Sequence, residues 1–200
     1  TKEHILYAFI NTTLVPDPQT LIQNGILLVR DGIIENIGAN LPIPKDAVVY
    51  DLRGKFIYPS FIDLYSDYGI KSKKNTKDNS RQNRRTGPQT LSNLKGPYNW
   101  NQAVHPETNA IDGFLSDSAD ANGWRSLGFG TVLTHNQDGI IRGTSTLVSL
   151  GTGLENNLIL KESVAANFSF SKGSSTQEYP SSLMGAIALI RQTYLDAQWY

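Results

Sequence analysis

Short runs of β-branched and aromatic residues, separated by turn residues, fill positions 1–58 and predict an all-β part. The clearest single strands lie at residues 4–15 and 47–52. Between them, residues 25–38 carry two apolar runs joined by Asp31-Gly32. This pattern predicts a hairpin, because a tight Asp-Gly turn needs two residues with positive φ. Four or five short strands without a helix look like part of a β-sandwich.

The second part, residues 59–200, alternates between strand and helix patterns. Residues 111–127 have helical spacing, with Ser118 as the expected N-cap and Gly128 as the residue that ends the helix. The glycine-bounded apolar run at 129–135 then predicts a buried strand. A strand, a helix and a second strand in this order imply a parallel sheet with a crossover connection.

Beyond this β-α-β unit the pattern becomes less regular. The glycine-rich stretch 139–153 predicts short β pieces and turns, and residues 167–171 predict a further strand. A final helix is expected to begin after Ser181 or Ser182. Its apolar residues recur at helical spacing, namely Leu183, Ala186, Ile187, Ile190, Tyr194 and Ala197.

Composition supports a packed core and excludes several classes of function. The chain has 200 residues, of which 39% are hydrophobic and 10% aromatic, and its formal net charge is zero. A balanced charge gives no general attraction to nucleic acid, and the absence of cysteine excludes disulfides and thiolate metal sites. No apolar run is long enough to span a membrane. Because the chain starts without Met and stops within an amphipathic pattern, we expect a fragment of a longer protein.

An insertion at about residues 71–103 differs in character from its surroundings. Residues 71–85 carry a net charge of +6, and aliphatic residues are almost absent before Leu91. A loop of this length and polarity predicts a flexible, solvated insertion. Docking of its basic residues on another part of the same protein remains a second interpretation. Nucleic acid is not expected, because no series of aromatic residues accompanies the charges.

The stretch from Gly54 to Asp67, GKFIYPSFIDLYSD, carries the most specific pattern. It resembles the signature of the amidohydrolase superfamily of metal-dependent hydrolases. In that family a strand leaves a small β-sandwich, turns at Pro-Gly and becomes the first barrel strand, which ends in a metal-binding His-x-His. Here Ser60 stands in place of the glycine, and Tyr65 and Asp67 stand in place of the two histidines. The motif is therefore degenerate at its ligands.

This resemblance implies an α/β fold with an all-β N-terminal part. Half of a composite β-sandwich, residues 1–58, would precede the first βα units of a TIM-like (β/α)₈ barrel, residues 59–200. The barrel is expected to be incomplete, because a full one needs about 250 residues. The expected partner is the remainder of the same polypeptide, with its C-terminal barrel and sandwich strands. Later segments of the chain are also similar to large bacterial proteins of this family, which suggests the bacterial cell envelope or periplasm.

Two strand ends are candidate positions for chemistry, because catalytic groups of a barrel lie at the C-terminal ends of its strands. One end carries Tyr65 and Asp67, and the other carries His135. An un-ionised tyrosine is a poor metal ligand, so we expect no metal and no catalytic residue here. A weakened metal site formed by Asp67 and His135 is the alternative. All three residues remain candidates for a pocket at the barrel mouth, whereas His4 and His105 are expected to be structural or exposed.

The resemblance implies that the parent protein hydrolyses C–N bonds of amides or cyclic amides. Zinc or another divalent metal would then be held beyond residue 200, and this segment would contain no cofactor. The segment itself is expected to be a non-catalytic scaffold module, and whether it has enzymatic activity stays open. The alternative is a pseudoenzyme or docking module, which binds a small molecule, a peptide or a partner chain without turnover.

Overall fold

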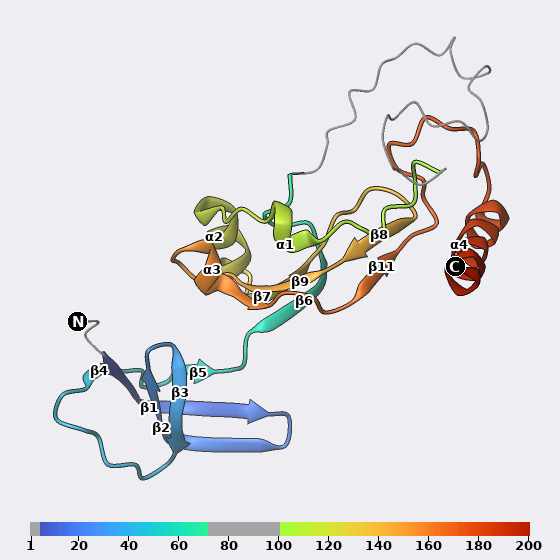
Figure 1. Cartoon of the computed structure of the whole chain (residues 1–200). Helices are drawn as coiled ribbons and strands as arrows, with labels where there is room; N and C mark the ends of the chain where they lie inside the picture. The colour runs from blue at the N-terminus through green and yellow to red at the C-terminus, as the bar shows by residue number, and fades with distance from the viewer. Residues whose placement is uncertain (1–4, 72–100) are drawn as a thin grey trace. The chain divides into compact units, whose positions relative to one another are not determined.

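The computed structural model describes residues 5–71 and 101–200, and the chain divides into two compact units, Thr1–Ser60 and Phe61–Tyr200 (Figure 1). His4 and most of the basic insertion lie outside the described residues. The last residues assigned to that insertion are not solvated. Asn101 and Ala103 are buried, and the Asn101 amide donates to the Tyr179 carbonyl at 3.0 Å.

Five strands form the sheet of the N-terminal unit, in the order β3-β2-β1-β4, with β5 also beside β1 (Figure 1). Their bounds are β1 Leu6–Asp17, β2 Thr20–Arg30, β3 Ile33–Gly38, β4 Val48–Asp51 and β5 Phe56–Ile57. The strands β1, β2 and β3 are antiparallel in sequence order, whereas β4 and β5 run parallel to successive halves of β1. The long strand β1 therefore organises this unit.

The hairpin predicted at Asp31-Gly32 is confirmed. Both residues have positive φ, 52° and 80° respectively. The preceding strand is longer than predicted, since β2 begins at Thr20 rather than at residue 25. The reason is a second tight turn, which reverses the chain directly after β1 and pairs Thr20 with Asp17.

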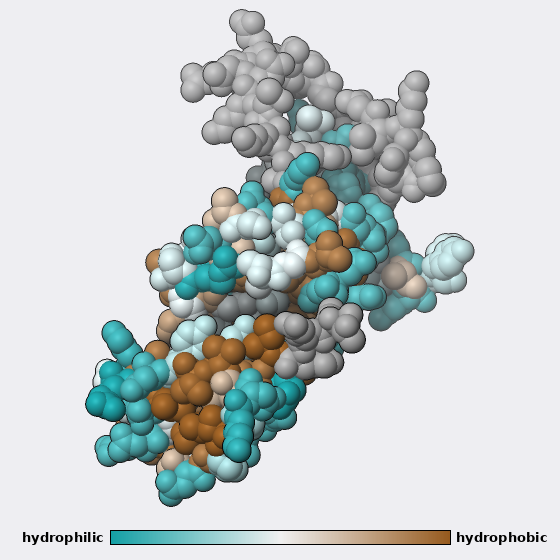
Figure 2. Space-filling model, turned by 90° about the vertical axis from the view of Figure 1, so that its left-hand side faces the viewer, coloured by the Kyte–Doolittle hydropathy of each residue, from teal (hydrophilic) through white to brown (hydrophobic). Residues whose placement is uncertain are grey.

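Much of the apolar surface of this sheet is exposed. Leu6, Ala8 and Leu28 form a small buried cluster. By contrast, Ile33 is 72% exposed and Phe56 57% exposed. Figure 2 shows hydrophobic residues gathered over the N-terminal unit. Exposed apolar residues on a sheet mark a surface that favours association with other chain segments.

The C-terminal unit contains short strands and four helices within its described residues. The strands are β6 Phe61–Ser66, β7 Phe129–Thr134, β8 Ile141–Thr144, β9 Thr146–Ser149, β10 Ile159–Lys161 and β11 Ala166–Phe168. The helices are α1 Ala110–Gly113, α2 Ser118–Ser126, α3 Glu155–Leu158 and α4 Leu183–Trp199. No helix in the part of the chain that the structure describes has the length and apolar content to cross a membrane.

The main sheet of this unit has the order β10-β9-β7-β6, and β8 pairs with β11 in a separate two-stranded sheet. The strands β6 and β7 are parallel, as the β-α-β pattern predicted. The strand β9 lies in the stretch for which short β pieces and turns were predicted, and it runs antiparallel to β7. A parallel neighbour needs a long crossover connection, usually a helix. Between β7 and β9 the chain forms β8 but no helix, so β9 returns in the opposite direction.

The helical pattern at 111–127 forms two helices rather than one. The chain is extended at Phe114, and α2 starts afresh at Asp117, which replaces Ser118 as the N-cap. The Asp117 carboxylate accepts hydrogen bonds from the Ala119 and Asp120 amides at 2.8 and 3.2 Å. The other predicted ends are confirmed, since Gly128 has a φ of 93° and Ser182 caps α4.

Two buried clusters hold this unit together. One joins the main sheet to the helices between β6 and β7, and it contains Tyr68, Phe114, Ala121, Val132, Val148 and Leu150. The other packs α4 against β8 and the segment before it, and it contains Ala103, Val104, Ile140, Ile141, Ala186 and Leu189. The second cluster fixes the position of β8, which carries Arg142.

Gly143 in β8 lies where no other residue fits, so its substitution tests this packing. Its φ is 75°, and an added Cβ would overlap the carbonyl oxygen of Thr108. We expect Gly143→Ala to destabilise the C-terminal unit by more than about 3 kcal/mol, because backbone atoms would have to move. The control is Gly128→Ala, with a similar φ but only the Phe61 side chain nearby, at 3.3 Å. It should cost about 1–2 kcal/mol.

The measurement is urea unfolding followed by tryptophan fluorescence, because all three tryptophans lie after residue 60. Equal losses of stability in the two variants would contradict the tight packing at Gly143.

Candidate functional site

The pairing of β6 with β7 places two of the sequence candidates close together. Ser66 is in register with Thr134 at the C-terminal ends of the two strands. The amide of His135 donates to the Ser66 carbonyl at 3.0 Å, which extends the pairing by one step. Because parallel strands end at the same edge of a sheet, Tyr65 and His135 meet there.

The Tyr65 and His135 rings are in direct contact. Their centroids are 4.9 Å apart and the ring planes make an angle of 70°, which is an edge-to-face arrangement. His135 is 1% exposed, and its Nδ1 atom is buried without a hydrogen-bond partner. Tyr65 is 59% exposed. One side of this pair is therefore enclosed by protein, and the other is open.

Arg142 in β8 completes the site, although the sequence analysis did not single it out. Its Nη1 donates to the Tyr65 hydroxyl at 2.9 Å, and its Nε donates to the Gly139 carbonyl at 3.0 Å. The residue is only 5% exposed. The sequence did contain a signal for Arg142, namely a charged residue within the apolar run of residues 139–143. Arginine is rarely buried without a partner, so its position in such a run is informative.

The charges around His135 favour its neutral form. Burial lowers the pKa of His135 below its ordinary value of 6.5, and the Arg142 guanidinium lowers it further by repulsion. The negative charge of Asp67 acts in the opposite direction but is a smaller effect. At neutral pH the imidazole is therefore uncharged, and Arg142 carries the positive charge of the site.

Asp67 takes no part in the contacts among Tyr65, His135 and Arg142, although its charge acts on His135. It lines a cavity of about 580 Å³ together with Tyr68, Asp117 and Trp124. No hydrogen bond or ion pair joins its carboxylate to Tyr65 or His135 within the described residues. Tyr65 and Asp67 thus lie in different environments, although only one residue separates them in the sequence. His105 also lies apart, with its Nδ1 3.3 Å from the Glu107 carboxylate.

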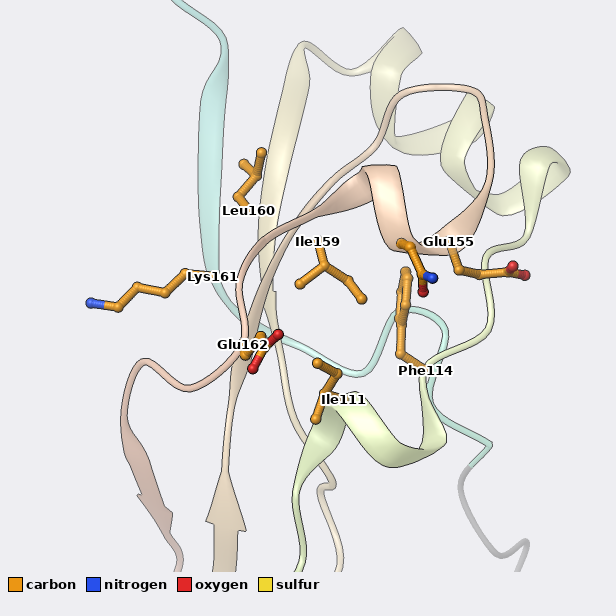
Figure 3. A pocket seen from close by; sticks show the side chains of 8 residues that line it. Ile111, Phe114, Glu155, Ile159, Leu160, Lys161 and Glu162 are labelled. Atoms are coloured by element: carbon orange, nitrogen blue, oxygen red, sulfur yellow. The ribbon is translucent and has the colours of Figure 1, made fainter.

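A second cavity, of about 560 Å³, lies between α1, α3 and β10 (Figure 3). Ile111, Phe114 and Ile159 form its apolar wall, and the side chain of Lys161 points away from them. Its lining contains carboxylates but no histidine, so it offers no group that exchanges protons near neutral pH.

These residues do not fit a divalent metal. In the ranges 5–71 and 101–200, no group of three or more histidines and carboxylates lies close enough to hold an ion. The candidate imidazole, His135 at the end of β7, is already acted on by the positive charge of Arg142, and a fixed positive charge repels a second cation. The arrangement can instead bind anions and donate hydrogen bonds.

The lowered pKa of His135 predicts a pH dependence of stability. As the pH falls below 6.5, the unfolded chain takes up a proton at His135 before the folded protein does. This contribution to stability is therefore complete above that pH and is lost below it. We expect the free energy of unfolding to decrease more steeply in the wild type than in His135→Gln between neutral pH and about pH 5. Urea unfolding at each pH measures both slopes, and an equal or steeper slope in the variant would contradict this prediction.

Comparison with known proteins gives a clear result only for the fold. No protein-family model matches the chain. A stretch of 56 residues is 38% identical to Protein unc-33 of Caenorhabditis elegans, and it covers 28% of this chain and 6% of that protein. One solved amidohydrolase structure matches 32% of this chain at 33% identity. Its TM-score of 0.29 is too low to support an argument about the fold.

The crystal structure of an amidohydrolase from Thermotoga maritima MSB8 superposes on 97% of this chain with a TM-score of 0.70. The sequences are 23% identical, and the match covers 48% of the T. maritima chain. This chain therefore spans about half the length of that protein, and over this half it has the fold of an amidohydrolase.

Proposed function

We propose that this chain is a non-catalytic scaffold module of a longer amidohydrolase that hydrolyses C–N bonds of amides or cyclic amides. Within it, β6 and β7 would be the first two strands of a (β/α)₈ barrel. The fold shared with the T. maritima amidohydrolase supports this proposal, as does the parallel pairing of β6 with β7. The divalent metal, zinc or another, would be held by residues outside this segment and would supply the activated water.

The observation that carries the non-catalytic role is the hydrogen bond between Arg142 and Tyr65. Through this bond the permanently charged guanidinium of Arg142 is held at the end of β6. Metal-assisted hydrolysis needs neutral imidazoles or carboxylates around a cation. A phenol hydroxyl held by a guanidinium does not meet that requirement.

The remainder of the same polypeptide is the proposed partner. The strand β6 lies at the end of its sheet, and Leu64 on it is 70% exposed. The N-terminal sheet has exposed apolar residues of its own, including Ile33 and Phe56. Further strands of the barrel and of the sandwich would cover both surfaces, because unpaired edges and apolar patches favour association.

A second function, binding without turnover, is favoured by one specific observation. Arg142 is a buried cation whose described hydrogen bonds go only to a carbonyl and a hydroxyl oxygen. A pseudoenzyme would use such a site to hold a ligand. Metal and hydrolytic activity in the longer protein would support the first function, and the absence of both would support the second.

Metal analysis of the 200-residue chain tests the non-catalytic role. When the chain is purified without chelator, we expect far less than one zinc per chain by elemental analysis, because the donor atoms do not converge. The longer protein, purified in the same way, should contain metal. Near-stoichiometric zinc in the chain alone, lost in a double Asp67→Ala, His135→Gln variant, would overturn the proposal.

Substitution of Asp67 gives an independent test. We expect Asp67→Ala to leave the rate of hydrolysis by the longer protein nearly unchanged, because its carboxylate lines a separate cavity. Steady-state kinetics on an amide substrate measure this, with Asp120→Ala, in the same cavity, as the matched control. A loss of about a hundredfold or more for Asp67→Ala alone is the size expected when a metal site is disturbed, and it would contradict the scaffold role.

A further inference from the structure

The C-terminal unit contains a buried positive charge without a counter-charge. Arg142 is 5% exposed, and its side chain donates to two neutral oxygens, on Gly139 and Tyr65. No carboxylate in the described residues lies within ion-pairing distance of its guanidinium. An arginine stays protonated at any physiological pH, and a buried unpaired charge costs several kcal/mol. The site therefore favours the arrival of an anion.

Two carboxylates near Arg142 in the sequence or in space, Asp138 and Asp67, do not pair with it. Asp138 precedes β8 by three residues, and its carboxylate accepts hydrogen bonds from the amide and the hydroxyl of Ser174. Asp67 is exposed and lines the separate cavity beside Trp124. The positive charge of Arg142 is therefore left for a group that the described chain does not provide.

The groups around Arg142 are mostly hydrogen-bond donors. The Tyr65 hydroxyl accepts from Arg142, so its own proton is left to donate. Nη2 of Arg142 has no described partner, and a neutral imidazole offers one N–H. Nδ1 of His135 is buried without a hydrogen-bond partner among the described residues, while a backbone hydrogen bond with Leu133 acts on the ring and raises its pKa. Tyr65 itself is 59% exposed to solvent.

We propose that Arg142, Tyr65 and His135 together bind the carboxylate group of a small organic acid. The planar guanidinium fork matches the two oxygens of a carboxylate in geometry. The Tyr65 hydroxyl would donate to the same group. The site carries one full positive charge, and Asp67 adds a negative charge within electrostatic range of His135. A singly charged carboxylate therefore fits better than a doubly charged phosphate.

This inference goes beyond the proposed function and is tested separately from it. The ¹⁵N-labelled 200-residue chain is titrated with sodium acetate against sodium chloride at constant ionic strength, and the amide shifts of β6, β7 and β8 are followed by NMR. We expect saturable shifts with acetate. Neither chloride nor inorganic phosphate should reproduce them, and equal responses to these anions would overturn the carboxylate assignment.

Three variants locate the binding. Arg142→Gln should weaken acetate binding by about tenfold or more, the size expected for a charge-assisted hydrogen bond. Tyr65→Phe removes one hydroxyl from a half-exposed ring, should fold normally, and should weaken binding severalfold. Arg53→Gln is the matched control, because that arginine is 82% exposed and should leave binding unchanged.

The outcomes separate the possibilities. Unchanged acetate binding in Tyr65→Phe would overturn the proposal, and this variant decides the matter if Arg142→Gln does not fold. Equal weakening in Arg53→Gln would indicate a general charge effect and would also overturn it. Metal content does not enter this test, so the carboxylate site and the scaffold role succeed or fail independently.

Discussion

The parallel pairing of β6 with β7 is the constraint on which the C-terminal unit depends. It aligns Ser66 with Thr134 and continues through the hydrogen bond from the His135 amide to the Ser66 carbonyl. The helices α1 and α2 must then fit into the connection between the two strands, where they cover Val132 and Val148 on the sheet. The same pairing places the side chains that follow each strand at one edge. Both the packing of the unit and its candidate chemistry therefore follow from one register.

The charge at this edge is carried by the protein itself. A metal ion exchanges with solvent and polarises a bound water, whereas a guanidinium remains attached and only donates hydrogen bonds. Arg142 reaches Tyr65 from 77 positions further along the chain, and its charge adds to the burial that lowers the pKa of His135. An edge built in this way presents a fixed cation and hydrogen-bond donors at the ends of two parallel strands.

Local signals predicted much of the fold. The Asp31-Gly32 turn, the Ser182 cap and the glycine after α2 each depend on backbone geometry that only certain residues adopt, so the sequence shows them directly. The short elements α3 and β10 and the direction of β9 depend on contacts between distant segments. For the same reason, Tyr65 and His135 were found from their positions at strand ends, but Arg142 was not. Its role arises from a contact with Tyr65 that no spacing reveals.

The edge strand β3 has a consequence for the behaviour of the chain in solution. Ile33, Ile34 and Ile37 are all exposed on β3, which pairs only with β2 among the described strands. Such a segment is a template for strands of other molecules, and it favours ordered aggregation at high concentration. Its one charged residue, Glu35, interrupts the apolar run and pairs with Arg30 at 3.3 Å. Glu35 is therefore the one residue on β3 itself whose charge opposes such pairing, in the manner of a gatekeeper residue.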